Sequence, residues 1–101
     1  MIRINNEPLP EPQGLVLYYL PDPAGPRRLR LTISLNNLDA AQAQQILSAT
    51  AAPCTLSLFD PRLGAQRAMQ ATVRESQLQV RHMEAGQPSR SDLLLTLEES
   101  A

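Results

Sequence analysis

The stretch Leu29–Leu47, LRLTISLNNLDAAQAQQIL, changes its hydrophobic rhythm halfway along. Up to Leu35 the apolar residues occupy every second position, which is the repeat of a β-strand with one buried face. From Asp39 onward they recur at intervals of three and four residues, which is the repeat of an amphipathic α-helix. The sequence therefore predicts a strand that leads directly into a short helix.

The predicted helix covers residues 39–50 and has clear start and stop signals. Asp39 is a favoured N-cap residue, and Gln42 follows three positions later, as in a capping box. Pro53 ends the helix because it cannot continue the backbone hydrogen bonding. A helix of about twelve residues is marginal in isolation. We therefore expect its narrow apolar stripe to pack against a sheet.

Strand patterns separated by turn residues occupy most of the remaining sequence. Asn5-Asn6 and the DPRLG stretch at 60–64 predict turns, the second with Gly64 at positive φ. A break at residues 74–77 predicts a β-bulge or a tight reversal, and Asn36-Asn37 is expected to end the strand before the helix. The expected strands are 2–4, 14–20, 28–35, 54–59, 69–73, 78–80 and 92–99.

This pattern predicts an α+β fold that is mainly β. We expect an antiparallel β-sandwich or small barrel of about seven strands, with one short α-helix packed on it. The 101 residues, 43% of them apolar, form a single domain over residues 1–101. The net charge of −1 is too small to predict a nucleic-acid or membrane surface. No stretch approaches the ~18 apolar residues of a membrane span.

The residue types that usually carry catalysis are scarce. The one cysteine, Cys54, shares the parity of Leu56 and is predicted to be a buried thiol. The one histidine, His82, continues the parity of Val80 and is predicted to be half-buried in a strand. The four glycines form no phosphate-binding loop. We therefore predict no catalytic residues, no metal site and no cofactor site, and a protein that is not an enzyme.

Residues 14–20, GLVLYYL, are apolar at both parities. One interpretation is a central strand, covered by a sheet on one side and by the helix on the other. The other is that one face lies in the core and the second face is a subunit interface flanked by arginine. All nine basic residues are Arg, which suits interfaces, although a GC-rich genome produces the same bias. The predicted interface residues are Val16, Tyr18, Leu20, Arg28 and Arg30.

Several features follow one order along nearly the whole chain. They are the opening IRINNEPLPEP (2–12), the alternating strand, the helix LDAAQAQQIL (38–47), the turn FDPRLG (59–64) and the closing LLLTLEE (93–99). This order resembles small tail proteins of long-tailed bacteriophages, related to tail-tube and distal-tail (baseplate hub) β-sandwich domains. Those families carry one short helix between strands and stack as rings, commonly hexameric.

The resemblance implies a structural viral protein that acts through virion assembly. It would form a homo-oligomeric ring and contact other tail or baseplate proteins. It would be located in the virion tail after assembly in the bacterial host cytoplasm. Tail-tube proteins have a long hairpin that lines the tube, and the sequence predicts none here, which favours a distal-tail, connector or adaptor role. The alternative is a small monomeric β-domain that binds a ligand or peptide in the host cell, near Tyr18, Tyr19 and Phe59.

Overall fold

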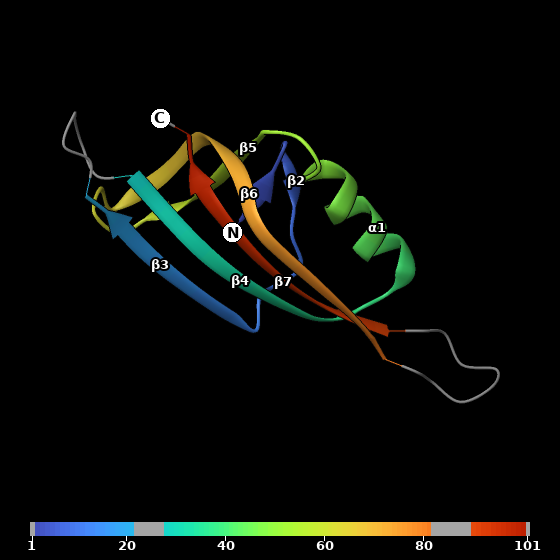
Figure 1. The fold of residues 1–101 in the computed structure, drawn as a ribbon. Coiled ribbons are helices and arrows are strands. Elements are labelled where there is room, and N and C mark those ends of the chain that lie inside the picture. The colour runs from blue at the N-terminus through green and yellow to red at the C-terminus, as the bar shows by residue number, and fades with distance from the viewer. Residues whose placement is uncertain (1, 22–27, 82–89, 101) are drawn as a thin grey trace.

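The computed structural model describes residues 2–21, 28–81 and 90–100. These residues form seven strands and one helix, which Figure 1 shows from the N-terminus in blue to the C-terminus in red. The elements are β1 (Arg3–Ile4), β2 (Glu7–Pro8), β3 (Gly14–Leu20), β4 (Arg28–Leu38), α1 (Ala40–Ala49), β5 (Cys54–Asp60), β6 (Ala65–Arg81) and β7 (Arg90–Glu99).

The strands belong to one antiparallel sheet in the order β2-β1-β5-β6-β7-β4-β3. The helix α1 contacts β7 and β4, the two strands between β6 and β3. The predicted mainly β fold, with seven antiparallel strands and one helix, is therefore confirmed.

The strand-to-helix switch lies where the sequence predicts it. The Asp39 carboxylate accepts a hydrogen bond from the Gln42 backbone N–H at 2.7 Å. The Gln42 side-chain oxygen accepts one from the Asp39 backbone N–H at 3.0 Å, which completes the capping box. Ala43 and Ile46 are buried on the face that packs on the sheet. The helix thus depends on the sheet for its apolar contacts, as expected.

The prediction that Asn36-Asn37 ends β4 is wrong, because the strand continues to Leu38. The register between β4 and β7 shifts between Leu35 and Leu38, and Asn37 has a φ of 60°. Asparagine tolerates this left-handed conformation better than most residues. The asparagine pair therefore forms a β-bulge that bends the strand toward the helix.

The two strands predicted at 69–73 and 78–80 are parts of one strand, β6, which is 17 residues long. Its register with β7 shifts between Val73 and Glu75, so Arg74 is the extra residue of a bulge. Because one residue is inserted, the side chains that point inward lie at odd positions up to Val73 and at even positions from Leu78 onward. The bulge prediction is confirmed and the tight reversal is wrong. A long hairpin of β6 and β7 is therefore present, contrary to expectation.

The turn at Asn5-Asn6 is confirmed, with φ values of 52° and 67°. Two successive positive φ values are the geometry of a type I′ hairpin turn. The turn joins β1 to β2, a short strand at Glu7–Pro8 that is not among the expected strands. Gly64 also has positive φ, at 62°, as predicted for the turn between β5 and β6.

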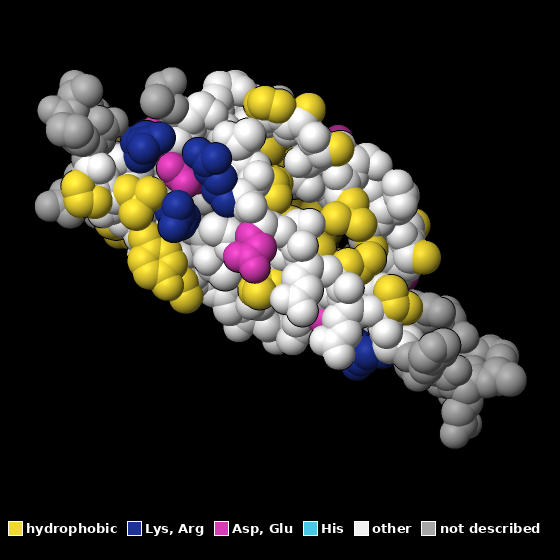
Figure 2. Space-filling model, viewed as in Figure 1, with side chains coloured by type: hydrophobic (Ala, Val, Ile, Leu, Met, Phe, Trp, Pro, Cys, Tyr) yellow, Lys and Arg dark blue, Asp and Glu magenta, His cyan; other side chains and the backbone are white. Residues whose placement is uncertain are grey.

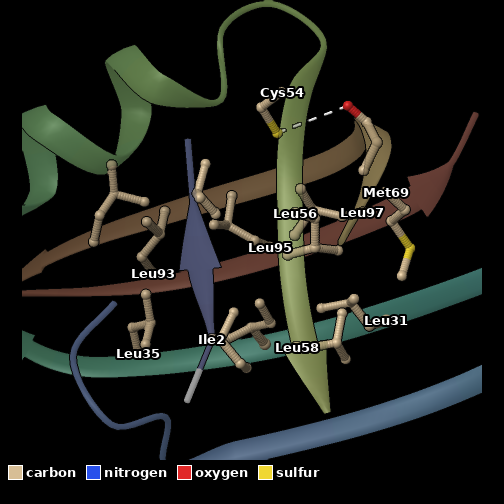
Figure 3. Close-up of a cluster of buried hydrophobic side chains, with 14 of the residues drawn as sticks. Ile2, Leu31, Leu35, Cys54, Leu56, Leu58, Met69, Leu93, Leu95 and Leu97 are labelled. Atoms are coloured by element: carbon tan, nitrogen blue, oxygen red, sulfur yellow. Dashed lines mark hydrogen bonds between the residues drawn. The ribbon is translucent and has the colours of Figure 1, made fainter. Parts of the chain in front are cut away.

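The core lies inside the curved sheet. Figure 3 shows β5 and β1 crossing over β7 and β4, with the apolar side chains of all four strands between them. The buried apolar residues are Ile2, Ile4, Leu29, Leu31, Ile33, Leu35, Leu38, Ala43, Ile46, Cys54, Leu56, Leu58, Met69, Ala71, Leu93, Leu95 and Leu97. The sheet folds over itself in this way, and α1 covers the remaining part of the apolar core.

One sequence prediction lies outside the described residues. His82, predicted as a strand residue, is in the range 82–89.

Candidate functional site

The strand β3 forms one edge of the sheet. Its register pairs it with β4 from Gly14 opposite Ser34 to Leu20 opposite Arg28, and β3 is the last strand in the sheet order. The interpretation of residues 14–20 as a central strand is therefore wrong. An apolar edge strand leaves backbone hydrogen-bonding groups and side chains available to another chain.

The two faces of β3 have different surroundings. Leu17 and Tyr19 pair with core residues of β4 and pack against the core. Val16 and Tyr18 point to the outer face, where 48% and 49% of their surfaces are exposed. Leu15, on the inner face near the end of the strand, is also exposed. The core face is thus that of Leu17, and the outer face holds uncovered apolar surface.

The predicted interface residues come together on the outer face. Tyr18 lies opposite Arg30 and Leu20 opposite Arg28, and Val16 is next in line on the same face. Figure 2 shows arginine side chains gathered on one face of the molecule around an acidic group, with hydrophobic side chains beside them. We call the set Val16, Tyr18, Leu20, Arg28 and Arg30 the β3 patch.

Sequence reasoning missed the acidic centre of this face, Glu98 of β7. Its carboxylate lies 3.5 Å from Arg28 Nη1, 3.0 Å from Arg30 Nη2 and 3.1 Å from Arg74 Nε. Only 5% of the Glu98 side chain is exposed, because the arginines cover it. The sequence did contain a signal for Glu98, because the alternation in β7 places it on the polar face of that strand. In the sheet, β7 lies between β4 and β6. These ion pairs hold the arginines of the β3 patch in place.

A second buried carboxylate, Asp60, anchors β3 from its inner face. The Tyr19 hydroxyl donates a hydrogen bond to Asp60 Oδ1 at 3.0 Å. In the sheet order three strands separate β3 from β5, which ends at Asp60. The Arg62 guanidinium stacks 4.1 Å from the centre of the Tyr19 ring. This contact closes one end of the curved sheet and fixes the position of the edge strand.

Both carboxyls are held in the charged form. The hydrogen bond from Arg30 is the main cause that lowers the pKa of Glu98, and it outweighs the effect of burial. Burial raises the pKa of Asp60, but the hydrogen bonds from the Arg62 backbone, from Tyr19 and from the Arg62 side chain, together with the Arg62 charge, lower it by more. The pKa values therefore lie below the ordinary 4.5 of Glu98 and 3.8 of Asp60.

These pKa shifts predict how stability depends on pH. A carboxyl whose pKa is lower in the folded chain stabilises it above the unfolded pKa, and this contribution is lost as the pH falls through the folded pKa. We expect the free energy of unfolding to decrease below about pH 4. Urea unfolding between pH 2 and 7 measures this dependence. Glu98→Gln should show a smaller decrease than the wild type, and an equal decrease would contradict the assignment to Glu98.

The described residues contain no group that would suit a metal ion, and none of their helices is long and apolar enough to cross a membrane. Cys54 is buried, and burial raises the pKa of its thiol. One hollow of about 330 Å³ lies between α1 and the β1–β2 hairpin, and two others lie elsewhere on the described surface. None of these hollows is lined by Tyr18, Tyr19 or Phe59. Tyr18 and Tyr19 lie on opposite faces of β3.

A comparison of the chain with protein-family models, with curated proteins and with solved structures gave no match.

Proposed function

We propose that this protein is a structural, non-enzymatic component of the tail of a long-tailed bacteriophage. It acts by self-assembly into a ring and by contacts with neighbouring tail or baseplate proteins, as a distal-tail, connector, adaptor or tube-like ring protein. The observation that carries the assembly role is the uncovered apolar edge strand β3, together with the β3 patch beside it.

An edge of this kind is a liability for a monomer. Proteins that stay monomeric usually protect edge strands with lysine, proline or bulges, or keep them short. The seven residues of β3 contain no charged residue and no proline, and its ladder with β4 has no register shift. Val16 and Tyr18 are half exposed beside arginines that are already ordered by Glu98. Apolar and aromatic surface with arginine beside it is typical of the centre of protein interfaces.

The assignment to a phage tail rests on the resemblance in element order. The capped helix directly after the alternating strand, the turn with Gly64 and the closing strand are all elements of the structure. The long β6–β7 hairpin removes the one departure from tail-tube proteins that the sequence indicated. The tube-like role therefore stands beside the distal-tail and adaptor roles in this proposal.

The double substitution Val16→Lys/Tyr18→Lys tests the assembly role. Lysine places charge on the β3 patch next to Arg30, and it protects edge strands in other proteins. Each truncated or charged anchor residue of an interface costs roughly 1–2 kcal/mol, so we expect the dissociation constant of self-association to rise at least tenfold. Light scattering over a concentration series measures this change, and negative-stain microscopy shows whether rings form.

Phe59→Lys is the matched control, since Phe59 is 53% exposed on β5 and lies outside the β3 patch. It should leave self-association unchanged. If the wild-type chain remains a monomer at high concentration, the assembly role is wrong. An equal loss in both variants would also contradict it, because the effect would then not depend on the patch.

The alternative function, a monomeric β-domain that binds a ligand or peptide, predicts the opposite result. The hollow between α1 and the β1–β2 hairpin is the observation that favours it, since Leu9, Pro10 and Ile46 give it apolar walls. A monomer that keeps its size in the light-scattering series and binds a peptide would support this alternative.

A further inference from the structure

The sheet has a second uncovered edge, in the outer half of β6. β5 pairs with β6 only as far as Cys54 opposite Ala71, whereas β7 accompanies β6 to Arg81. Among the described residues, the stretch 72–81 therefore has a strand on one side only. Figure 1 shows this half of the β6–β7 hairpin extending beyond β5. Every residue from Arg74 to Arg81 is exposed, including Leu78 at 40% and Val80 at 58%.

We propose that β3 of one copy pairs with the stretch 72–81 of β6 in the next copy, so that the sheets of neighbouring copies become continuous. This inference rests on the proposed self-assembly and names the two surfaces that meet. The occupant of each edge is a second copy of this chain.

The strand directions support this pairing. From β6 through β7 and β4 to β3, each neighbouring pair is antiparallel, so β6 and β3 run in opposite directions. Suppose that a second copy is related to the first by a rotation about an axis parallel to the strands. Strand β6 of the second copy then lies next to β3 of the first, and the two strands are antiparallel. The alternation of directions continues through the contact, and the outer faces of both sheets stay on the same side. Seven residues of β3 fit within the ten residues 72–81.

The side chains of the two edges are also complementary. Leu78 and Val80 share the inner face with Leu93 and Ser91, their partners on β7, so this edge has apolar residues on the same side as Leu15 of β3. The two arginines of this stretch are already paired, Arg74 with Glu98 and Arg81 with Asp92. Glu75, on the outer face, forms no ion pair with a described residue, and Arg28 and Arg30 lie one strand in from β3. Opposite charges near the contact favour this partner over a like-charged one.

The other arrangement open to β3 is a two-fold pairing with β3 of a second copy. That contact would bring the arginines of both patches to the same side and would leave Leu78 and Val80 exposed. The pairing of β3 with β6 covers both apolar edges with one type of contact. Because this contact joins two different surfaces, it repeats from copy to copy and closes into a ring or grows as a filament.

Disulfide cross-linking between two singly substituted chains tests the pairing. Val16→Cys is mixed with Glu75→Cys, Gln77→Cys or Gln79→Cys, three outer-face positions that cover the staggers open to the two strands. Facing residues of neighbouring strands lie within the Cα distance that a disulfide needs. We expect one of these mixtures to give several-fold more cross-linked dimer than the others. Wild-type chain, whose only thiol is the buried Cys54, gives the background.

Gln70→Cys is the matched control, because Gln70 is exposed on the same face of β6 but already has β5 beside it. Its mixture with Val16→Cys should not exceed background. If the chains associate by light scattering but no position after the bulge cross-links above this control, the pairing is wrong and self-assembly stands. Efficient cross-linking of Val16→Cys with Tyr18→Cys would instead establish the two-fold arrangement. If the chains do not associate at all, the proposed assembly role itself fails.

Discussion

Asp60→Ala is expected to lower the free energy of unfolding by about 3 kcal/mol. Asp60 has no exposed surface, and its carboxylate accepts hydrogen bonds from the Tyr19 hydroxyl and from the Arg62 backbone N–H, each at 3.0 Å. Arg67 Nε lies 3.0 Å from the same carboxylate. Removing one member of a buried charged group leaves the others without a partner, which costs about 3–5 kcal/mol. The low end applies here because Arg62 and Arg67 keep 34% and 24% of their side-chain surface exposed.

Thermal unfolding measures the effect of Asp60→Ala, with an expected decrease of about 10 °C or more in Tm for a domain of this size. Two milder variants separate the contribution of the charge from that of one hydrogen bond. Asp60→Asn keeps an acceptor oxygen and loses the charge, and Tyr19→Phe removes one hydrogen bond worth about 1 kcal/mol. We expect Asp60→Ala to be the least stable of the three and Tyr19→Phe the most stable. A change in Tm of less than about 3 °C in Asp60→Ala would show that the cluster does not hold β3 to β5.

The elements that follow from local chemistry were predictable from the sequence. The capping box of Asp39 and Gln42 needs only residues three positions apart, and the turns at Asn5-Asn6 and at Gly64 need only residues that tolerate positive φ. The alternation of apolar and polar residues predicted the buried face of β4, β5 and β7, whereas β3 is apolar at both parities and its core face follows only from its pairing with β4. The boundaries failed at the two bulges, since Asn37 and Arg74 each interrupt the pattern of a strand that continues on the other side.

Only the part of the candidate site that lies on β3 and β4 was predictable from the sequence. Val16, Tyr18 and Leu20 share a parity, and a hairpin of β3 with β4 places Arg28 and Arg30 beside them. Glu98 and Asp60 depend on contacts between strands far apart in the sequence, which a single sequence does not specify. The free edge of β6 depends on where β5 ends relative to β7, and that is a property of the whole sheet order.

Leu95→Ala is expected to lower the free energy of unfolding by about 2–5 kcal/mol, because it removes a fully buried side chain and leaves a cavity. Leu95 lies on β7 opposite Ile33 of β4, and Figure 3 shows it between the crossing strands of the core. Urea unfolding measures the loss.

Leu94→Ala makes the same chemical change one residue earlier, on the outer face, where Leu94 is 36% exposed. It should cost clearly less than Leu95→Ala, about 1–2 kcal/mol, because Leu94 is only partly buried and its truncation leaves no enclosed cavity. The difference between the two variants measures the packing of β5 and β1 over β7, independently of strand propensity, which both share. Equal losses in Leu95→Ala and Leu94→Ala would mean that the outer face is buried as deeply as the core.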